Sequence, residues 1–359
     1  MRIDDKRYYN LQKTLTYNAE VMAIIGAAGK GKTYTTRGYC LKQALKNGEL
    51  FVEVCRTKAE RDEVKTGYFD KLGMDEDFKG LEFDCRRNIF FARTRPPEEG
   101  EPAGDWVRVG YIVALSEVQT TKRRTYAGAR NIIMDEFIIE RIDRFHTYLH
   151  NEWNLLARVV NSCVREDAND KNRKHPRLFL LGNAVDLLNP YFQLFGIKSE
   201  PPYGYSWWGS DDLRVLLHYV PADEYDRERR DSTLAGRMSK ITGYDEESFG
   251  NSFEVDNRYI GKKTKASKPY IGFRFEGRVY GIWADMRQGY YYVVAKEPPE
   301  RVQVFSLTRD DDSPNYIAAR AGMKPLRAVS DMYYMGGVLF DSPSTRENFL
   351  RAMRLFGIR

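Results

Sequence analysis

One short stretch constrains the fold of this chain more than any other. Residues 26–33, Gly-Ala-Ala-Gly-Lys-Gly-Lys-Thr, match the phosphate-binding P-loop pattern G-x-x-x-x-G-K-[ST] over its full length. The apolar run at residues 21–25 indicates a buried strand before the loop, and residues 33–45 indicate a helix after it. A P-loop needs this order of strand, loop and helix. The sequence therefore predicts a nucleotide site at the end of a buried strand.

The residue types explain how such a loop would hold phosphates. Glycine at positions 26 and 31 allows backbone torsions that a Cβ would forbid, so successive N–H groups can turn toward phosphate oxygens. Lys32 can reach the β- and γ-phosphates, and the Thr33 hydroxyl can ligate Mg²⁺. The alternative is a glycine-rich turn with an exposed lysine, which the flanking strand and helix disfavour. The predicted nucleotide-binding residues are Gly26, Ala27, Ala28, Gly29, Lys30, Gly31, Lys32, Thr33 and Tyr34.

A second nucleotide signature follows the P-loop in the sequence. The apolar residues 132–134 lead directly into two adjacent carboxylates, Asp135 and Glu136. Asp135 is predicted to hold Mg²⁺, directly or through water, and Glu136 to polarise the attacking water. An apolar run that ends in acids is a weak signal by itself, and its position downstream of a P-loop strengthens it.

Polar or flexible residues end four predicted strands, at Gly26, Arg56, Asp135 and Asn183. Four such strands predict one parallel sheet of an α/β fold, with the ligand at its carboxyl edge. Asn183 is placed where a sensor group would contact the γ-phosphate or the attacking water. The alternative for this residue is an ordinary turn-forming asparagine after a strand.

Composition limits the class of protein. The chain has 359 residues, of which 42% are hydrophobic and 30% charged, as is common for globular domains. No apolar run approaches the roughly 18 residues of a membrane span, and the N-terminus lacks an apolar signal segment. The four cysteines are scattered without CxxC spacing, so we expect free thiols in a reducing cytoplasm and no zinc site.

The chain also divides by character. Tyr8, Tyr9 and Asn10 precede the first strand and would either stack on adenine or pack as an N-terminal arm. Residues 198–260 are rich in proline, glycine, tyrosine and charge, and we expect a helical linker with loops there. From residue 261 the pattern predicts β-hairpins and then two helices. Residues 261–359 carry a net charge of +7 against −1 for residues 1–260, which indicates either a polyanion partner or a solvated basic surface.

Five motifs together resemble the DNA-packaging motor ATPases of φ29-like tailed phages. They follow that family's order and spacing over most of the chain, and the Asn-Ala-Val…Asn-Pro-Tyr-Phe block is the most distinctive. The motifs are IGAAGKGKTY at 25–34, IIMDEF at 132–137, GNAVDLLNPYF at 182–192, DNRYIG at 256–261 and GIWADMRQG at 281–289.

The resemblance implies three domains: an additional-strand P-loop ATPase domain at residues 1–197, a linker domain at 198–260 and a small α+β domain at 261–359. The last would resemble the RNase H-like nuclease of large terminases with its cutting function lost. The resemblance further implies a homomeric ring, expected to be a pentamer, that uses ATP and Mg²⁺ to thread double-stranded DNA. The ring would act in the host cytoplasm, docked transiently on the portal of an empty procapsid, and the need for a structural RNA is left open.

Residue roles follow from the same motifs. Lys32 and Thr33 match the family's P-loop pair, and Asp135 and Glu136 match its acidic pair. Arg165 closes the helix that carries the family's trans-acting arginine, with Arg158 and Arg173 as alternatives, and Lys58 matches a lysine that also acts in trans. The other interpretation of these cations is solvated side chains near helix ends. The predicted catalytic residues are thus Glu136, Arg165, Asn183 and Lys58.

Two further predictions concern DNA. A packaging motor must accept every sequence, so DNA would be gripped through its phosphates. The candidates are Lys122, Arg123, Arg124, Lys262, Lys263, Lys265 and Lys268.

Residues 268–359 place one carboxylate, Asp285, on a predicted strand. A two-metal nuclease needs three or four carboxylates, so we expect no nuclease activity. The rival functions are a nucleotide-switched assembly or DNA-binding protein and a helicase.

Overall fold

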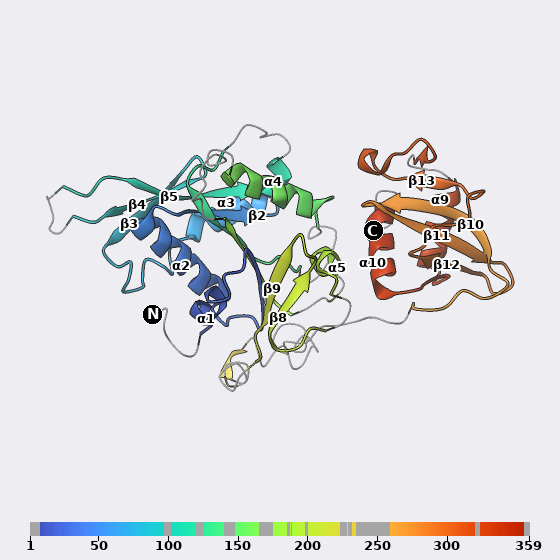
Figure 1. The fold of residues 1–359 in the computed structure, drawn as a ribbon, viewed down its shortest axis with the longest axis horizontal. Helices are drawn as coiled ribbons and strands as arrows, with labels where there is room; N and C mark the ends of the chain where they lie inside the picture. Colours follow the sequence, from blue (N-terminus) through green and yellow to red (C-terminus); the bar gives the residue numbers. More distant parts are fainter. Residues whose placement is uncertain are drawn as a thin grey trace. The chain divides into compact units, whose positions relative to one another are not determined.

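A computed structural model of the chain describes two compact units, Met1–Glu254 and Val255–Arg359. Within them, structural statements apply to residues 8–96, 102–118, 125–139, 148–164, 175–184, 187, 189–197, 200–222, 228, 232–234, 259–319 and 324–354. Each unit is described by itself (Figure 1).

A nine-stranded sheet forms the centre of the first unit, in the order β3-β4-β5-β2-β6-β7-β1-β9-β8. Its middle strands β5, β2, β6, β7, β1 and β9 pair in parallel. Strand β7 lies between the P-loop strand β1 and the acidic strand β6, which confirms the predicted additional-strand α/β fold. The bounds of these strands are β1 Val21–Ile25, β2 Leu50–Cys55, β5 Val107–Ala114, β6 Ala129–Met134, β7 Arg177–Gly182 and β9 Arg214–Tyr219.

Helices cover both faces of this sheet because its strands are apolar on both sides (Figure 1). Alternate residues of β1 point into two separate cores. One core contains side chains from α1 (Leu11–Leu15), α2 (Lys32–Asn47) and the segment after α3 (Lys58–Gly67). The other contains side chains from α4 (Glu152–Val164) and α5 (Pro190–Phe195). The unit is therefore a three-layer α/β/α domain.

Local sequence signals set where these helices begin and end. Thr57 and Glu60 form a reciprocal capping box at the start of α3. The Asn189 side chain caps α5, whose first residue is Pro190. Gly48, with φ +68°, ends α2 in the left-handed conformation that favours glycine.

Two strands lie shortly after residue 197, where the sequence indicated the start of a helical linker. Strands β8 (Gly204–Gly209) and β9 form an antiparallel hairpin, and β9 pairs in parallel with β1. The sheet thus continues beyond residue 197, where a boundary was expected. Buried side chains of β9 such as Leu216 lie in a core of the first unit, so this apolar strand belongs to the domain and not to a helical connection. At the other edge, β3 (Leu81–Arg86) and β4 (Ile89–Thr94) form an antiparallel hairpin.

The second unit contains a six-stranded mixed sheet in the order β14-β13-β10-β11-β12-β15, with two helices packed on it. Strands β10, β11 and β12 form an antiparallel meander, and β13 and β15 add in parallel at its sides. This arrangement confirms a small α+β domain, while its likeness to a nuclease stays a prediction. The bounds are β10 Lys268–Phe275, β11 Arg278–Asp285, β12 Tyr290–Val294, β13 Val304–Ser306, β14 Ile317–Ala318, α9 Lys324–Tyr334, β15 Val338–Phe340 and α10 Pro343–Arg354.

Across the part of the chain that the structure describes, no helix is both long enough and apolar enough to span a lipid bilayer.

Candidate nucleotide-binding site

The loop between β1 and α2 has the backbone geometry of an anion-binding turn. Gly29 has φ +74° and Gly31 has φ +82°, both in the left-handed region. An ideal Cβ on Gly31 would also lie 3.0 Å from the Tyr8 ring. Gly26 was also expected to need such torsions, but its φ is not positive. A Cβ at this position would lie 3.0 Å from Cβ of Val220, just after β9, which is a tight contact that favours glycine.

Lys32 lies against the inside of its own loop. Its ammonium donates hydrogen bonds to the carbonyl oxygens of Gly26 at 2.9 Å and Ala27 at 2.8 Å. A third bond, of 3.1 Å, reaches Oδ1 of Asn183, at the end of β7. Lysine and asparagine from adjacent strand ends are thus brought together, as the parallel sheet predicted. Phosphates that enter the loop would replace these acceptors as hydrogen-bond partners of the Lys32 ammonium. Lys32 is only 6% exposed.

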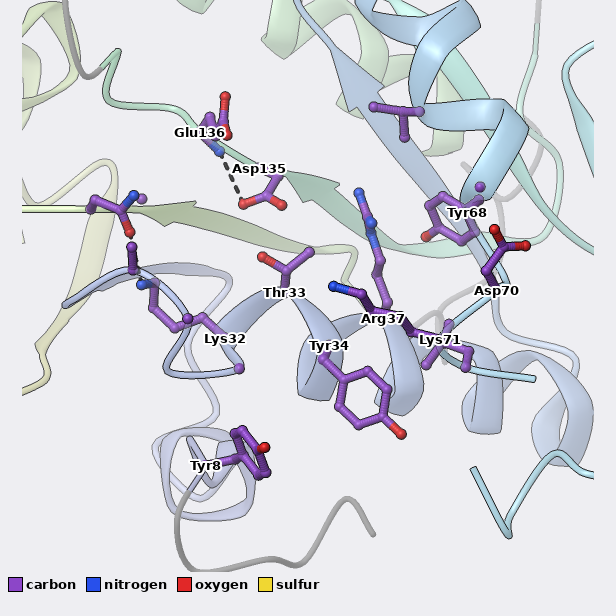
Figure 2. A pocket seen from close by; sticks show the side chains of 18 of the residues that line it. Tyr8, Lys32, Thr33, Tyr34, Arg37, Tyr68, Asp70, Lys71, Asp135 and Glu136 are labelled. Carbon is purple, nitrogen blue, oxygen red and sulfur yellow. Dashed lines mark hydrogen bonds between the residues drawn. The ribbon is translucent and has the colours of Figure 1, made fainter. Parts of the chain in front are cut away.

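The acidic pair follows β6, next to the loop. Figure 2 shows the Asp135 carboxylate facing Thr33 across a short space, while the Glu136 carboxylate points away from both. Glu136 has φ +51°, a conformation uncommon for a residue with a Cβ. This turn in the chain separates two consecutive carboxylates, and the Glu136 N–H donates to Oδ1 of Asp135 at 3.1 Å. The two acids therefore point in different directions, so Asp135 can serve a metal ion without bringing Glu136 to the same ion.

A pocket of about 790 Å³ collects these groups (Figure 2). Its volume suits a nucleotide-sized ligand. It is lined by most of the residues that the sequence singled out: Ala28, Gly29, Gly31, Lys32, Thr33, Tyr34, Asp135, Glu136 and Asn183. Gly26, Ala27 and Lys30 do not line it. The last two are buried, and the Lys30 carbonyl accepts a 2.8 Å bond from the Tyr9 N–H.

The residues around Thr33 and Asp135 fit a magnesium ion. A threonine hydroxyl and one carboxylate, completed by phosphate oxygens and water, are the ligands that Mg²⁺ takes in nucleotide sites. No group of three or more His, Cys, Asp or Glu side chains suited to a metal occurs among the described residues. One hydroxyl and one carboxylate suit an ion whose other ligands come from the nucleotide and water.

Sequence reasoning missed a charged cluster under the pocket. Arg37 lines the pocket and lies over the Tyr68 ring, with its guanidinium carbon 4.5 Å from the centroid. Arg37 also pairs with the buried Glu53, whose other oxygen accepts a 2.9 Å bond from the Tyr68 hydroxyl. Burial raises the pKa of the Glu53 carboxyl, and Arg37 beside it opposes that shift. The signal was available, since Arg37 follows Thr33 by four positions and so shares its helix face.

The N-terminal segment supports both interpretations that its sequence left open. Tyr9 is buried, and its hydroxyl bonds to Thr14 and to Nδ1 of His218 at 3.1 Å, so this residue packs as part of an arm. Tyr8 is half-buried and lines the pocket beside Gly31. The Asn10 side chain caps α1 and accepts from the Gln12 N–H at 2.9 Å.

The structure describes only some of the residues that were predicted to act in trans or to bind DNA. Lys58 is the exposed first residue of α3, and Arg158 is exposed on α4. Helix α4 ends at Val164, and the predicted Arg165 and its alternative Arg173 lie outside the described residues, as do Lys122, Arg123 and Arg124. In the second unit the lysines at 262, 263, 265 and 268 are all exposed, and the Lys263 ammonium lies 4.2 Å from the centroid of the Trp283 ring.

Comparison with known proteins places this site in a family. The family model described as Podovirus DNA encapsidation protein (Gp16) matches residues 3–354. The DNA packaging proteins of Bacillus phages phi29 and PZA are each 29% identical over 359 residues, covering 98% of this chain and 100% of theirs. A chain of the solved bacteriophage Phi-29 viral genome packaging motor assembly is 26% identical, with a TM-score of 0.64 and coverage of 98% of this chain and 100% of that one. The chain with this P-loop site therefore belongs to the podovirus DNA encapsidation protein family.

Proposed function

We propose that this protein is an ATP-driven double-stranded DNA translocase that packages a viral genome into an empty capsid through its portal. The observation that carries the proposal is the convergence of Lys32, Thr33, Asp135 and Glu136 on one pocket in a chain of this family. Relatives of similar length are named DNA packaging proteins. A packaging motor needs an ATPase site, and this pocket has the groups that hydrolysis requires.

The chemistry would be divided among the residues of the pocket. The P-loop N–H groups and Lys32 bind the phosphates, and Thr33 and Asp135 hold the magnesium ion. Bound Mg²⁺ supplies positive charge that stabilises the developing charge on phosphate oxygens. Glu136 accepts a hydrogen bond from the attacking water and orients it toward the γ-phosphate. Asn183, which bonds to Lys32, would report whether the γ-phosphate is present.

The remaining charge would come from a neighbouring subunit of a homomeric ring, proposed to be a pentamer. Arg165 follows α4 directly and is our candidate for the arginine that stabilises the transition state in trans. Lys58, exposed at the start of α3, is the second candidate. Such a ring would act in the host cytoplasm, docked on the procapsid portal, and a structural RNA could tether it there.

We also propose that the second unit does not cut DNA. Support comes from what its carboxylates bind. Asp285 is 2% exposed and accepts bonds from the Thr264 hydroxyl and from the N–H groups of Arg287 at 3.0 Å and Gln288 at 3.2 Å. The Thr264 hydroxyl bond holds the pKa of Asp285 below its usual value. A carboxylate saturated by its own turn is a poor ligand for a catalytic metal.

Asp311 has the same kind of role. It is buried, and its oxygens accept from the N–H groups of Glu276 at 3.1 Å and Gly277 at 2.8 Å and from the Thr308 hydroxyl at 2.9 Å. It thus closes the turn between β10 and β11. Asp311 is the central member of the run Asp310–Asp312 and is only 1% exposed.

The experiment that tests this function measures subunit stoichiometry and ATP turnover of the purified protein with and without duplex DNA. We expect a ring-forming protein whose hydrolysis rate rises when duplex DNA is added. A protein that binds ATP without turnover would indicate a nucleotide-switched assembly factor. Separation of the strands of a forked duplex would indicate a helicase.

Measuring DNA affinity at several salt concentrations tests the exposed lysines of the second unit. Phosphate contacts release counterions, so DNA affinity should fall steeply with salt and depend little on sequence. Replacing Lys262, Lys263, Lys265 and Lys268 by glutamine should shallow the salt slope by about one unit for each residue that contacts phosphate. Replacing Lys122, Arg123 and Arg124 by glutamine tests the other candidate set in the same way. If the quadruple variant keeps the slope and affinity of the parent protein, those four lysines are a solvated surface only.

A further inference from the structure

Behind Glu136 lies a buried polar cluster that the chemistry above does not use. It consists of Arg56 at the end of β2, Glu152 at the start of α4 and Tyr191 in α5. These three residues are only 7%, 3% and 2% exposed, in that order. We call these three residues the Arg56 cluster. Three separate elements thus bring a cation, an anion and a hydroxyl together inside the apolar core.

Hydrogen bonds connect the three members of the cluster. Nε of Arg56 donates to Oε2 of Glu152 at 2.8 Å, and the Leu149 N–H donates to the same oxygen at 2.8 Å. The Tyr191 hydroxyl donates to Oε1 of Glu152 at 2.7 Å. The Glu152 carboxylate is therefore fully occupied, and it fixes the orientation of the guanidinium.

The other end of that guanidinium holds the backbone of the acidic pair. Nη2 of Arg56 lies 3.2 Å from the carbonyl oxygen of Glu136 and 3.3 Å from that of Phe137. On the opposite side, the Phe137 N–H donates to the Leu181 carbonyl of β7 at 3.0 Å. The peptide group between Glu136 and Phe137 thus accepts a hydrogen bond from Arg56, which follows β2, and donates one to β7.

This support coincides with an unfavourable conformation. Glu136 is one of a few non-glycine residues described with positive φ, and such a backbone persists only where its surroundings impose it. A buried ion pair adds little net stability compared with a well-packed apolar core. The Arg56–Glu152 pair contacts the strained backbone of Glu136, the proposed base. A role in positioning Glu136 explains this pair better than a contribution to stability does.

We propose that Arg56, held by Glu152, is a positioning residue that fixes the Glu136 backbone so that its carboxylate meets the attacking water. The inference rests on the proposed function of Glu136. An arginine is required because its planar fork can reach a carboxylate and two successive carbonyls together, which a single ammonium cannot. Because Glu152 begins α4, the same ion pair links this backbone to the helix that ends immediately before Arg165.

Arg56→Lys tests the proposal while keeping the charge. We expect its ATP turnover to fall on the order of 10²-fold, as when a reacting group is displaced by about an ångström. Its affinity for a fluorescent ATP analogue should not change, since the variant leaves the P-loop intact. In a Glu136→Gln background the same substitution should cost no further turnover, because a residue that acts through Glu136 has nothing left to position.

Arg61→Lys is the matched control. Arg61 is also buried and paired, with Glu117 and Asp62, but makes no described bond to the acidic pair. It should lose thermal stability without losing turnover per folded subunit. Tyr191→Phe removes the hydroxyl that bonds to Glu152 and also contacts Sδ of Met134 at 3.3 Å. It should give a milder change in the same direction, and it serves as the test if Arg56→Lys folds poorly.

The outcomes separate the inference from the proposed function. Parent-like turnover in both Arg56→Lys and Tyr191→Phe would overturn the positioning role and leave the ATPase proposal standing. A loss that only follows the folded fraction, or one that adds fully to Glu136→Gln, would overturn it as well. A parent protein without ATP turnover would overturn the proposed function, and the inference with it.

Discussion

Replacing Glu136 by glutamine is expected to leave ATP binding intact and to lower the hydrolysis rate by about 10²–10⁴-fold, the usual contribution of a general base. The amide keeps the shape of the side chain and removes the charge that orients water. Asp135 remains to hold the metal ion, because the left-handed turn at Glu136 directs the two carboxylates apart. Single-turnover hydrolysis and nucleotide binding, measured on the same preparation, separate the two steps.

Two other variants are compared with Glu136→Gln. Glu20→Gln removes an exposed carboxylate just before β1, at the opposite edge of the sheet, and should behave as the parent protein. Lys32→Ala should weaken nucleotide binding itself, since the ammonium inside the loop is lost. Near-normal turnover in Glu136→Gln would show that another group activates the water.

Replacing Arg165 by alanine is expected to lower turnover by about 10³–10⁵-fold, the range found for arginine fingers. The physical reason is the loss of a positive charge beside the γ-phosphate as it becomes more negative. Because the arginine is proposed to act on a neighbour's nucleotide, the variant should still bind ATP in its own pocket. Turnover and binding are measured as for Glu136→Gln.

Mixing the Arg165→Ala and Glu136→Gln proteins tests more directly whether Arg165 acts between subunits. An Arg165→Ala subunit keeps Glu136, and a Glu136→Gln subunit keeps Arg165. A mixed ring therefore contains some interfaces with both groups intact, and turnover should recover above that of either variant alone. If no ratio of the two proteins recovers activity, Arg165 acts within its own subunit or has no catalytic role, and Arg158→Ala and Arg173→Ala are then the variants to mix.

Four neighbouring strands of the central sheet were predictable because each has a clear local signal in the sequence. Residues 21–25 and 178–182 are continuous apolar runs followed by polar residues, and parallel strands of that kind place their ends together. That rule alone brought Lys32, Asp135 and Asn183 to one edge, where the structure has them lining one pocket. The structure shows that Thr57 and Asn189 cap the starts of α3 and α5, and these are local signals that the sequence also contains.

What could not be predicted depends on contacts between distant segments. Strand β9 is recognisable only through its pairing with β1, almost two hundred residues earlier. The role of Gly26 depends on the approach of Val220, from the same distant hairpin. Arg56 looked like the polar end of a strand, and its pairing with Glu152 joins residues whose sequence separation is 96. No local pattern encodes such a buried ion pair.

The most direct test of the account is DNA packaging itself. Empty capsids that carry the portal are mixed with the protein, duplex DNA and ATP, and the DNA that survives nuclease digestion is measured. The account predicts protected full-length duplex with ATP, and none with Glu136→Gln or without nucleotide. Vigorous ATP hydrolysis without protected DNA, or protection that does not require ATP, would contradict the claim that this site drives DNA into the capsid.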